Sequence, residues 1–176
     1  GTFGPAKVTL GAHKWQEGSF DTEDDIDIYT LKTAFSPMEG TTLGADIYWL
    51  NSQQGNDGTN ASSAPKGDYW YLGLSGKGKA GPVDISGWFL FNTGTADKNV
   101  AIGQTKDVDV QGWGLSLKVA GAVDTVKWAV RGMYLPGDDD DTDTDYDSLL
   151  LPAAPADAFP FYDAGMMIML ADVYRN

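Results

Sequence analysis

Hydrophobic and polar residues alternate along most of the chain with a period of two. In segment 82–92, the odd-numbered positions from Val83 to Phe91 are apolar or Gly, and polar residues such as Asp84 and Ser86 lie between them. Segments 42–49 and 125–134 alternate in the same way. Successive side chains of a strand point to opposite faces, so this pattern predicts β-strands whose two faces meet different surroundings.

The alternation predicts an all-β chain of about eight strands, with no convincing helical period. The expected strands are 5–16, 25–35, 42–51, 68–77, 82–93, 107–119, 124–135 and 160–173. Two of them change phase. In the second strand, the apolar residue Ile26 is at an even-numbered position and Phe35 at an odd-numbered one. In the sixth strand, the apolar residues change from even-numbered to odd-numbered positions near Gly112. Because Gly at a phase change is typical of a bulge, we expect a β-bulge at Gly112.

The connections between the expected strands are short and long in turn. Short links occupy 36–40, 78–81 and 120–123, and long ones occupy 17–24, 52–67, 94–106 and 136–159. In an up-and-down antiparallel sheet, alternate connections lie at opposite ends, so every short turn falls at one end. Transmembrane β-barrels have this asymmetry, whereas a soluble sandwich with Greek-key crossings has no reason to have it.

Aromatic and charged residues are distributed unevenly. Most Trp and Tyr residues, Trp49 and Trp70 among them, lie near the long-loop end, as expected for side chains at the level of lipid headgroups. The alternative is that they form the core of a sandwich. Acidic residues crowd the long loops 17–24 and 136–159. Charges within the strands lie mainly on the less apolar face, which would line the lumen of a barrel: Asp46, Asp84, Lys118, Lys127 and Arg131.

Composition excludes several classes of function. The chain has 12 Lys and Arg against 25 Asp and Glu, a net charge of −13. This argues against nucleic-acid binding, because phosphate contacts need clustered Lys and Arg. With no Cys and only His13, disulfide frameworks, thiolate chemistry and sites with two His are excluded. No apolar run approaches the roughly 20 residues of a transmembrane helix. No catalytic arrangement is recognisable, so we expect no enzymatic activity and no required cofactor.

Three segments combine alternating apolar positions with aromatic residues and Gly. They are YWYLGLSG at 69–76, VDISGWFLFN at 83–92 and WGLSLK at 113–118. With the asymmetric loops, this pattern resembles bacterial outer-membrane β-barrels, porin-like proteins in particular. The resemblance spans nearly the whole chain and concerns architecture. It implies that residues 1–176 form an antiparallel up-and-down transmembrane barrel, or a segment of one, in contact with outer-membrane lipid and lipopolysaccharide.

The number of strands decides what such a barrel does. Eight strands closed alone enclose an interior filled by side chains, whereas about sixteen leave an aqueous channel. Small inward residues such as Gly44 and Ser116 favour a segment of a larger barrel of about 16 strands, although Tyr48 and Trp88 share that face. The chain lacks the terminal aromatic residue usual in these barrels, which also favours a segment. It begins without a signal peptide, which processing explains.

An acidic run is the candidate metal site. From position 139, every second residue is an aspartate: Asp139, Asp141, Asp143, Asp145 and Asp147. Alternating carboxylates in a loop can surround Ca²⁺ with oxygen ligands, or divalent ions can bridge them to lipopolysaccharide phosphates. The run lacks the Gly and the closing Glu of an EF-hand loop. A solvated acidic loop is the simpler alternative.

The favoured hypothesis is an outer-membrane, porin-like channel for passive diffusion of small solutes or ions. Lys118, Lys127 and Arg131 would form a basic patch in the lumen, with Asp46 and Asp84 on other strands. One alternative is a membrane barrel without transport that acts as an anchor, an adhesin or a sheath around a partner protein. The other is a soluble all-β binding module, whose apolar faces would point inward. A homo-oligomer or an enclosed partner protein is compatible with the membrane hypotheses.

Overall fold

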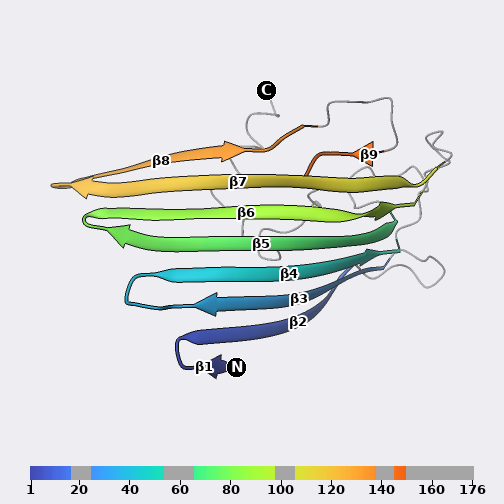
Figure 1. Cartoon of the computed structure of the whole chain (residues 1–176), viewed down its shortest axis with the longest axis horizontal. Helices are drawn as coiled ribbons and strands as arrows, with labels where there is room; N and C mark the ends of the chain where they lie inside the picture. Colours follow the sequence, from blue (N-terminus) through green and yellow to red (C-terminus); the bar gives the residue numbers. More distant parts are fainter. Residues whose placement is uncertain (17–24, 54–65, 98–105, 138–144, 150–176) are drawn as a thin grey trace.

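The structure is a computed structural model that describes residues 1–16, 25–53, 66–97, 106–137 and 145–149. These residues form one sheet of nine strands (Figure 1). The strands are β1 (Thr2–Phe3), β2 (Ala6–Gln16), β3 (Ile26–Phe35), β4 (Thr42–Ser52), β5 (Gly67–Ala80), β6 (Val83–Ala96), β7 (Val108–Val123), β8 (Val126–Tyr134) and β9 (Asp145–Tyr146). β1 to β8 follow one another in chain order, each antiparallel to the next, and β9 pairs with β7 in parallel.

Strands β2 to β8 confirm seven of the eight strands predicted from the alternation. The eighth, 160–173, lies outside the described residues, as does segment 17–24. The sequence does not predict β1 and β9, because two residues are too few to show a period. The all-β class and the antiparallel up-and-down order of β1 to β8 therefore follow the prediction. None of the described residues belongs to a helix that could cross a membrane.

Two of the predicted links, 78–81 and 120–123, belong largely to strands. The hairpin turns are Gly81–Pro82 and Asp124–Thr125, so β5, β6 and β7 are longer than predicted. Gly81 has a φ of 62°, which glycine adopts without steric cost, and Asp124 has a φ of 54°. Gly78, which belongs to the predicted link 78–81, pairs with Ile85 within the ladder.

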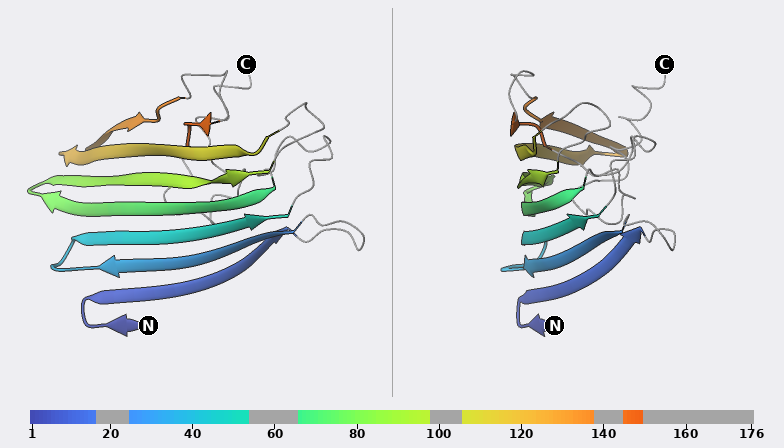
Figure 2. Two further views of the ribbon diagram at one scale, coloured as in Figure 1. Left: turned by 45° about the vertical axis from the view of Figure 1, so that its right-hand side comes forward. Right: turned by 90° about the vertical axis from the view of Figure 1, so that its right-hand side faces the viewer.

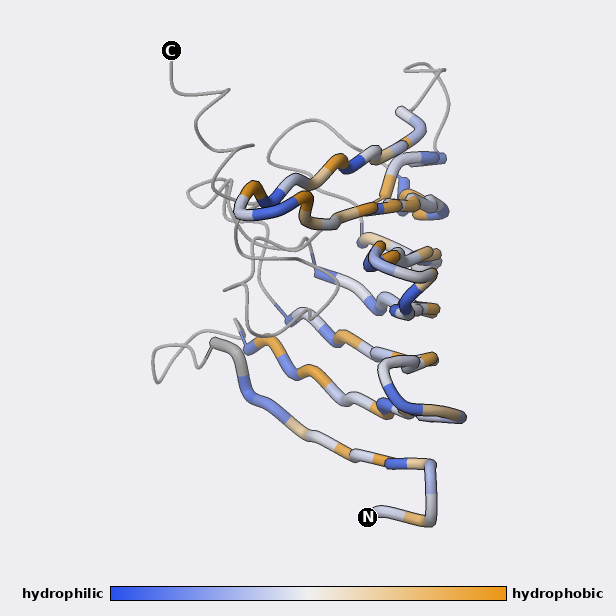
Figure 3. The backbone as a smooth tube through the Cα atoms, turned by 90° about the vertical axis from the view of Figure 1, so that its left-hand side faces the viewer, coloured by the Kyte–Doolittle hydropathy of each residue, from blue (hydrophilic) through white to orange (hydrophobic). Residues whose placement is uncertain are grey.

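The sheet is a curved, open layer. Figures 2 and 3 show the strands bending into an arc, with β1 and β2 at one edge and β8 at the other. Among the described residues these two edges do not pair with each other. β1 pairs only with the start of β2, and β8 pairs with β7 from Leu115 to Val123. The described strands thus form an open sheet, antiparallel from β1 to β8 and parallel between β7 and β9, and do not by themselves close a barrel.

The two faces of the sheet differ in exposure. We call the concave face, which carries Tyr48 and Tyr71, the inner face, and the opposite one the outer face. The inner face holds the buried apolar cluster: Ile26, Ile28, Tyr48, Leu50, Tyr69, Tyr71, Leu90, Ala96, Val110 and Leu149. The outer face holds exposed apolar side chains: Tyr29, Leu43, Ile47, Trp70, Leu72, Leu74, Ile85, Trp113, Leu115, Leu117, Trp128 and Val130. The outward direction of these residues agrees with the predicted strand polarity.

The phase changes in β3 and β7 occur without a bulge. β7 stays in one register with β6 throughout, and β3 does so with β4. The bulge predicted at Gly112 is therefore wrong. The inner face is apolar near the long loops, where Ile28 and Val110 are buried, and polar towards the short turns. A strand that passes from one zone to the other therefore carries apolar residues on its inner face near the long loops and on its outer face near the short turns. The register shift in β2 lies between Lys14 and Gln16.

Gly112 instead allows the chain to cross the inner face closely. A Cβ atom at Gly112 would overlap the backbone of Ser148 and Leu149, and one at Gly114 would collide with Leu135. Leu149 is buried in the inner cluster. The segment that follows β9 therefore packs directly on β7, at a point where any side chain would hold it away.

Gly112→Ala should lower the free energy of unfolding by about 1–3 kcal/mol, because the methyl group meets backbone that cannot move aside easily. Gly132→Ala is the matched control, since its Cβ would have no atom within 4 Å. It should be neutral or stabilise by less than about 1 kcal/mol. Urea unfolding followed by Trp fluorescence measures both. Equal effects of the two variants would contradict the close packing at Gly112.

Candidate binding groove on the inner face

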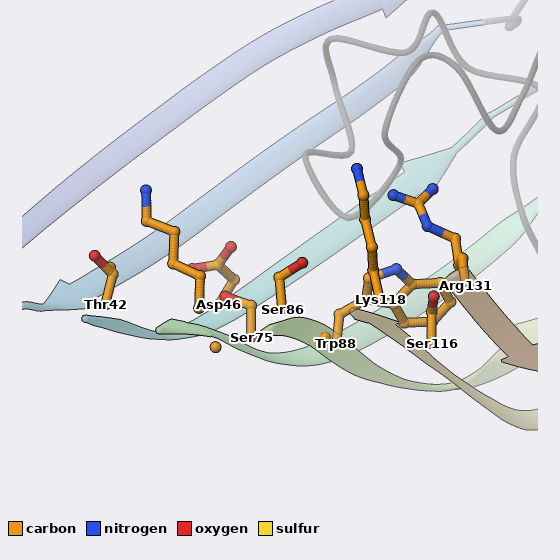
Figure 4. A pocket seen from close by; sticks show the side chains of 11 residues that line it. Thr42, Asp46, Ser75, Ser86, Trp88, Ser116, Lys118 and Arg131 are labelled. Carbon is orange, nitrogen blue, oxygen red and sulfur yellow. The ribbon is translucent and has the colours of Figure 1, made fainter. Parts of the chain in front are cut away.

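The polar half of the inner face contains a groove of about 350 Å³ that spans strands β4 to β8. Its lining residues are Thr42, Asp46, Ser75, Gly76, Lys77, Ser86, Gly87, Trp88, Ser116, Lys118 and Arg131. Figure 4 shows the labelled side chains rising from the strands to one side of the sheet. The strands present them together because they belong to the parity that faces inward on each strand.

One end of the groove is basic. Lys118 of β7 and Arg131 of β8 lie directly opposite each other in the antiparallel ladder. Such partners have Cβ atoms about 5 Å apart, so both charged groups reach the same volume above the sheet. Figure 4 shows the two side chains extending in the same direction. Lys77 adds a third cation to the lining, and Asp46 is its one acidic residue.

Asp46 is held by three groups at the other end of the groove. The Tyr48 hydroxyl donates a hydrogen bond to Asp46 Oδ2 at 3.2 Å, and the Thr33 amide donates to Oδ1 at 3.3 Å. Lys32 lies opposite Asp46 in the ladder, and its Nζ lies 5.4 Å from the centroid of the Tyr48 ring. Asp46 is 8 % exposed. These contacts fix its carboxylate in the wall, because a buried charge needs such partners.

Trp88 forms the apolar part of the groove. It lies between Ser75 of β5 and Ser116 of β7, which are its direct partners on the two sides. Both serines are much shorter than the indole, so the ring stands above them and remains partly exposed. Lys118 is its diagonal neighbour, because Lys118 pairs with Ser86 two residues away. The ring is thus beside the basic end.

The structure brings together three of the five residues predicted to line a lumen: Asp46, Lys118 and Arg131. Asp84 shares the inner parity but lies near the short turn, where it forms an exposed ion pair of 3.7 Å with Lys79. Lys127 is exposed near the turn between β7 and β8. Neither lines the groove. The sequence interpretation missed Lys77, although it placed this residue at the end of the predicted strand 68–77, and it treated Trp88 only as an obstacle to small inward residues.

The predicted calcium site lies mostly outside the described residues. This applies to Asp139, Asp141 and Asp143, whereas Asp145 and Asp147 are described and exposed. Asp145 belongs to β9 and pairs with Asp109 of β7. No group of three or more potential metal ligands occurs within the described ranges. Calcium binding by the acidic run stays a prediction.

The outer face carries a band of aromatic rings near the long-loop end. The neighbouring rings are Tyr29–Trp49 (centroids 5.0 Å apart), Trp49–Trp70 (5.8 Å), Phe89–Trp113 (6.1 Å) and Trp113–Tyr134 (5.5 Å). These contacts link rings on six consecutive strands, in two groups. The first three rings are exact register partners, and the second group lies further towards the short turns along its strands. The band is therefore oblique to the strand register.

Polar groups lie on the long-loop side of this aromatic band. Trp49 Nε1 donates a hydrogen bond to Asp68 Oδ1 at 3.1 Å, and Asn51 Nδ2 donates to the same oxygen at 2.8 Å. Thr95 and Asp109 form a similar pair on β6 and β7. On the other side of the band, the outer face is aliphatic, with Ile47 and Leu72 among its exposed residues. The outer surface thus passes from polar to aromatic to aliphatic along the strands.

Comparison of the chain with protein-family models, with curated protein sequences and with solved structures finds no match.

Tyr48→Phe should lower the free energy of unfolding by about 1–3 kcal/mol, because it removes the hydroxyl that donates to the buried Asp46 carboxylate. Tyr29→Phe is the control, since Tyr29 lies on the exposed outer face of β3 and its loss of a hydroxyl should change stability by less than about 0.5 kcal/mol. Chemical unfolding followed by circular dichroism measures both. Equal stability of the Tyr48→Phe variant and the unmodified protein would contradict a structural role for this hydrogen bond.

Proposed function

We propose that the chain forms part of the wall of a bacterial outer-membrane β-barrel, and that this barrel is a porin-like channel for passive diffusion of small solutes or ions. The observation that carries the proposal is the graded outer face, from the polar pair of Asn51 and Asp68 through aromatic rings to exposed aliphatic residues. Trp and Tyr favour the headgroup level, where one edge of the ring is apolar and the other can hydrogen-bond. The Trp49 indole has this orientation, because its N–H donates a hydrogen bond to Asp68 on the polar side of the aromatic rings.

The height of the apolar band supports a membrane environment. On β7, outward positions are apolar or Gly from Trp113 to Val123, a span of about 34 Å at about 3.4 Å per residue. Barrel strands tilt by about 35–45°, which reduces this span to a height of about 24–28 Å. The lipid-facing band of outer-membrane barrels is about 25 Å tall. The oblique course of the aromatic band is also expected if the strands are tilted. Rings at one depth in the membrane then lie at different register positions on successive strands.

The open edges support a larger barrel. Within the described ranges, β2 beyond its contact with β1 and the edge of β8 that faces away from β7 have no strand partner, so their backbone groups can pair with further strands. A wall of about 16 strands leaves an aqueous interior, and the groove with Lys118 and Arg131 would then face that interior. The soluble alternative would leave the outer aliphatic surface in water, and monomeric soluble proteins rarely expose apolar patches this extensive.

An arginine scan along β7 tests the membrane environment. Leu117 is 53 % exposed on the outer face, within the apolar band, and Gln111 lies on the same face in the polar zone. In lipid vesicles, Leu117→Arg should lower folding stability by about 2–4 kcal/mol and Gln111→Arg by less than about 1 kcal/mol. Urea titration of folding into vesicles measures both. In water an exposed Leu→Arg change costs little, so equal small effects would contradict a lipid-facing surface.

Conductance tests transport itself. The full gene-encoded protein in planar bilayers should produce stepwise ion currents, and Arg131→Ala should shift the reversal potential towards cation preference. Lys127→Ala removes the same charge from the same strand but about 14 Å away from Arg131, beyond the Debye length of about 10 Å, so its shift should be smaller. Folded, membrane-inserted protein without currents would contradict the channel and favour an anchor or sheath.

A further inference from the structure

We propose that the groove is a binding subsite for small aromatic carboxylates, with Lys118 and Arg131 contacting the carboxylate and Trp88 contacting the ring. The inference deepens the proposed function and rests on it only in assuming that the inner face is the solute side. It goes beyond passive diffusion, because it assigns to the wall a preferred class of solute and the residues that hold it.

The cationic pair supplies the carboxylate contact. Lys118 and Arg131 are direct partners in the ladder, so their charged ends converge above one point of the sheet. Arginine can donate two parallel hydrogen bonds to a carboxylate, and lysine adds a compact point charge.

Trp88 supplies the contact with the ring. Its indole lies diagonally next to Lys118, within reach of a ligand that is bound at the cationic pair. Ser75 and Ser116 beside it are short, which leaves space over the ring, and their hydroxyls are within the groove. An aromatic ligand can therefore stack on the indole while its carboxylate points to β7 and β8.

Size and charge restrict the ligand further. A volume of about 350 Å³ is near the lower end of small-molecule sites, which suits one ring and one acidic group. Lys77 pairs with Ser86 and Ser86 with Lys118, so Lys77 lies in register with Lys118 two strands away, about 10 Å at about 4.8 Å per strand. Asp46 lies three strands across and four residues along the register from Lys118, about 20 Å away. The lining charge nearest the pair is therefore another cation, which favours an acidic ligand.

Binding can be measured by isothermal titration of the full gene-encoded protein in detergent micelles with benzoate. Two further probes separate the contacts: benzyl alcohol keeps the ring without the charge, and acetate keeps the charge without the ring. Saturable binding of benzoate, with affinity about tenfold or more above either probe, is expected from one charged hydrogen-bonded contact and one stacked ring. Equal affinity of benzoate and benzyl alcohol, or no saturable binding of benzoate, would overturn the proposal.

Matched variants assign the site. Arg131→Gln and Trp88→Leu should each weaken benzoate binding about tenfold, while Lys127→Gln, the same charge change on the same strand outside the groove, should stay within about twofold. Arg131→Lys keeps the charge and controls for folding. A loss of benzoate affinity in this variant that is smaller than in Arg131→Gln supports a contact in which arginine donates two hydrogen bonds to the carboxylate. An equal loss in Lys127→Gln would mean diffuse attraction and overturn the site. Binding without conductance refutes the channel only, and conductance without binding refutes this subsite only.

Discussion

The strand register is the constraint on which the rest of the structure depends. From β3 to β7 each strand keeps a single register with its neighbours, so one parity of each strand faces inward along its whole length. Because the side-chain period of a strand is two, a slip by one residue would exchange the faces. Tyr48 would then leave the inner cluster and Ile47 would enter it. The same set of backbone pairs therefore places the buried residues on the inner face and the exposed aliphatic residues on the outer face.

The fixed register divides the inner face into two zones. Near the long loops it is apolar, and Leu149 packs there against the bare backbone at Gly112. Towards the short turns it is polar and contains the groove. The long strands β3 to β7 pass through both zones, so the boundary between the zones is expected in their sequences as a change in which alternate positions are apolar. β3 and β7 show the change most clearly.

Period-two alternation was enough to predict seven strands, their antiparallel order and the faces of their residues, because each strand is long and its faces differ. The same evidence misled at Gly112, since a change of surroundings and a bulge alter the pattern in the same way. It also missed β9, whose pairing with Asp109 is non-local and spans two residues. The groove could be predicted only in part. Parity places Asp46, Lys118 and Arg131 on one face, but their membership in one groove, with Trp88 and Lys77, depends on the lateral registers of four strand pairs.

The charges on the inner face oppose the charge of the whole protein. Although the chain carries −13 overall, the inner parities of β2 to β8 hold seven cations and two acids. The cations are Lys7, Lys32, Lys77, Lys79, Lys118, Lys127 and Arg131, and the acids are Asp46 and Asp84. Asp46 and Asp84 lie opposite Lys32 and Lys79, and three of the other five cations belong to β7 and β8. Charge of one sign in a concave surface concentrates ions of the other sign. The described strands therefore carry more cations than acids on their inner face, which the acidic composition of the chain gives no reason to expect.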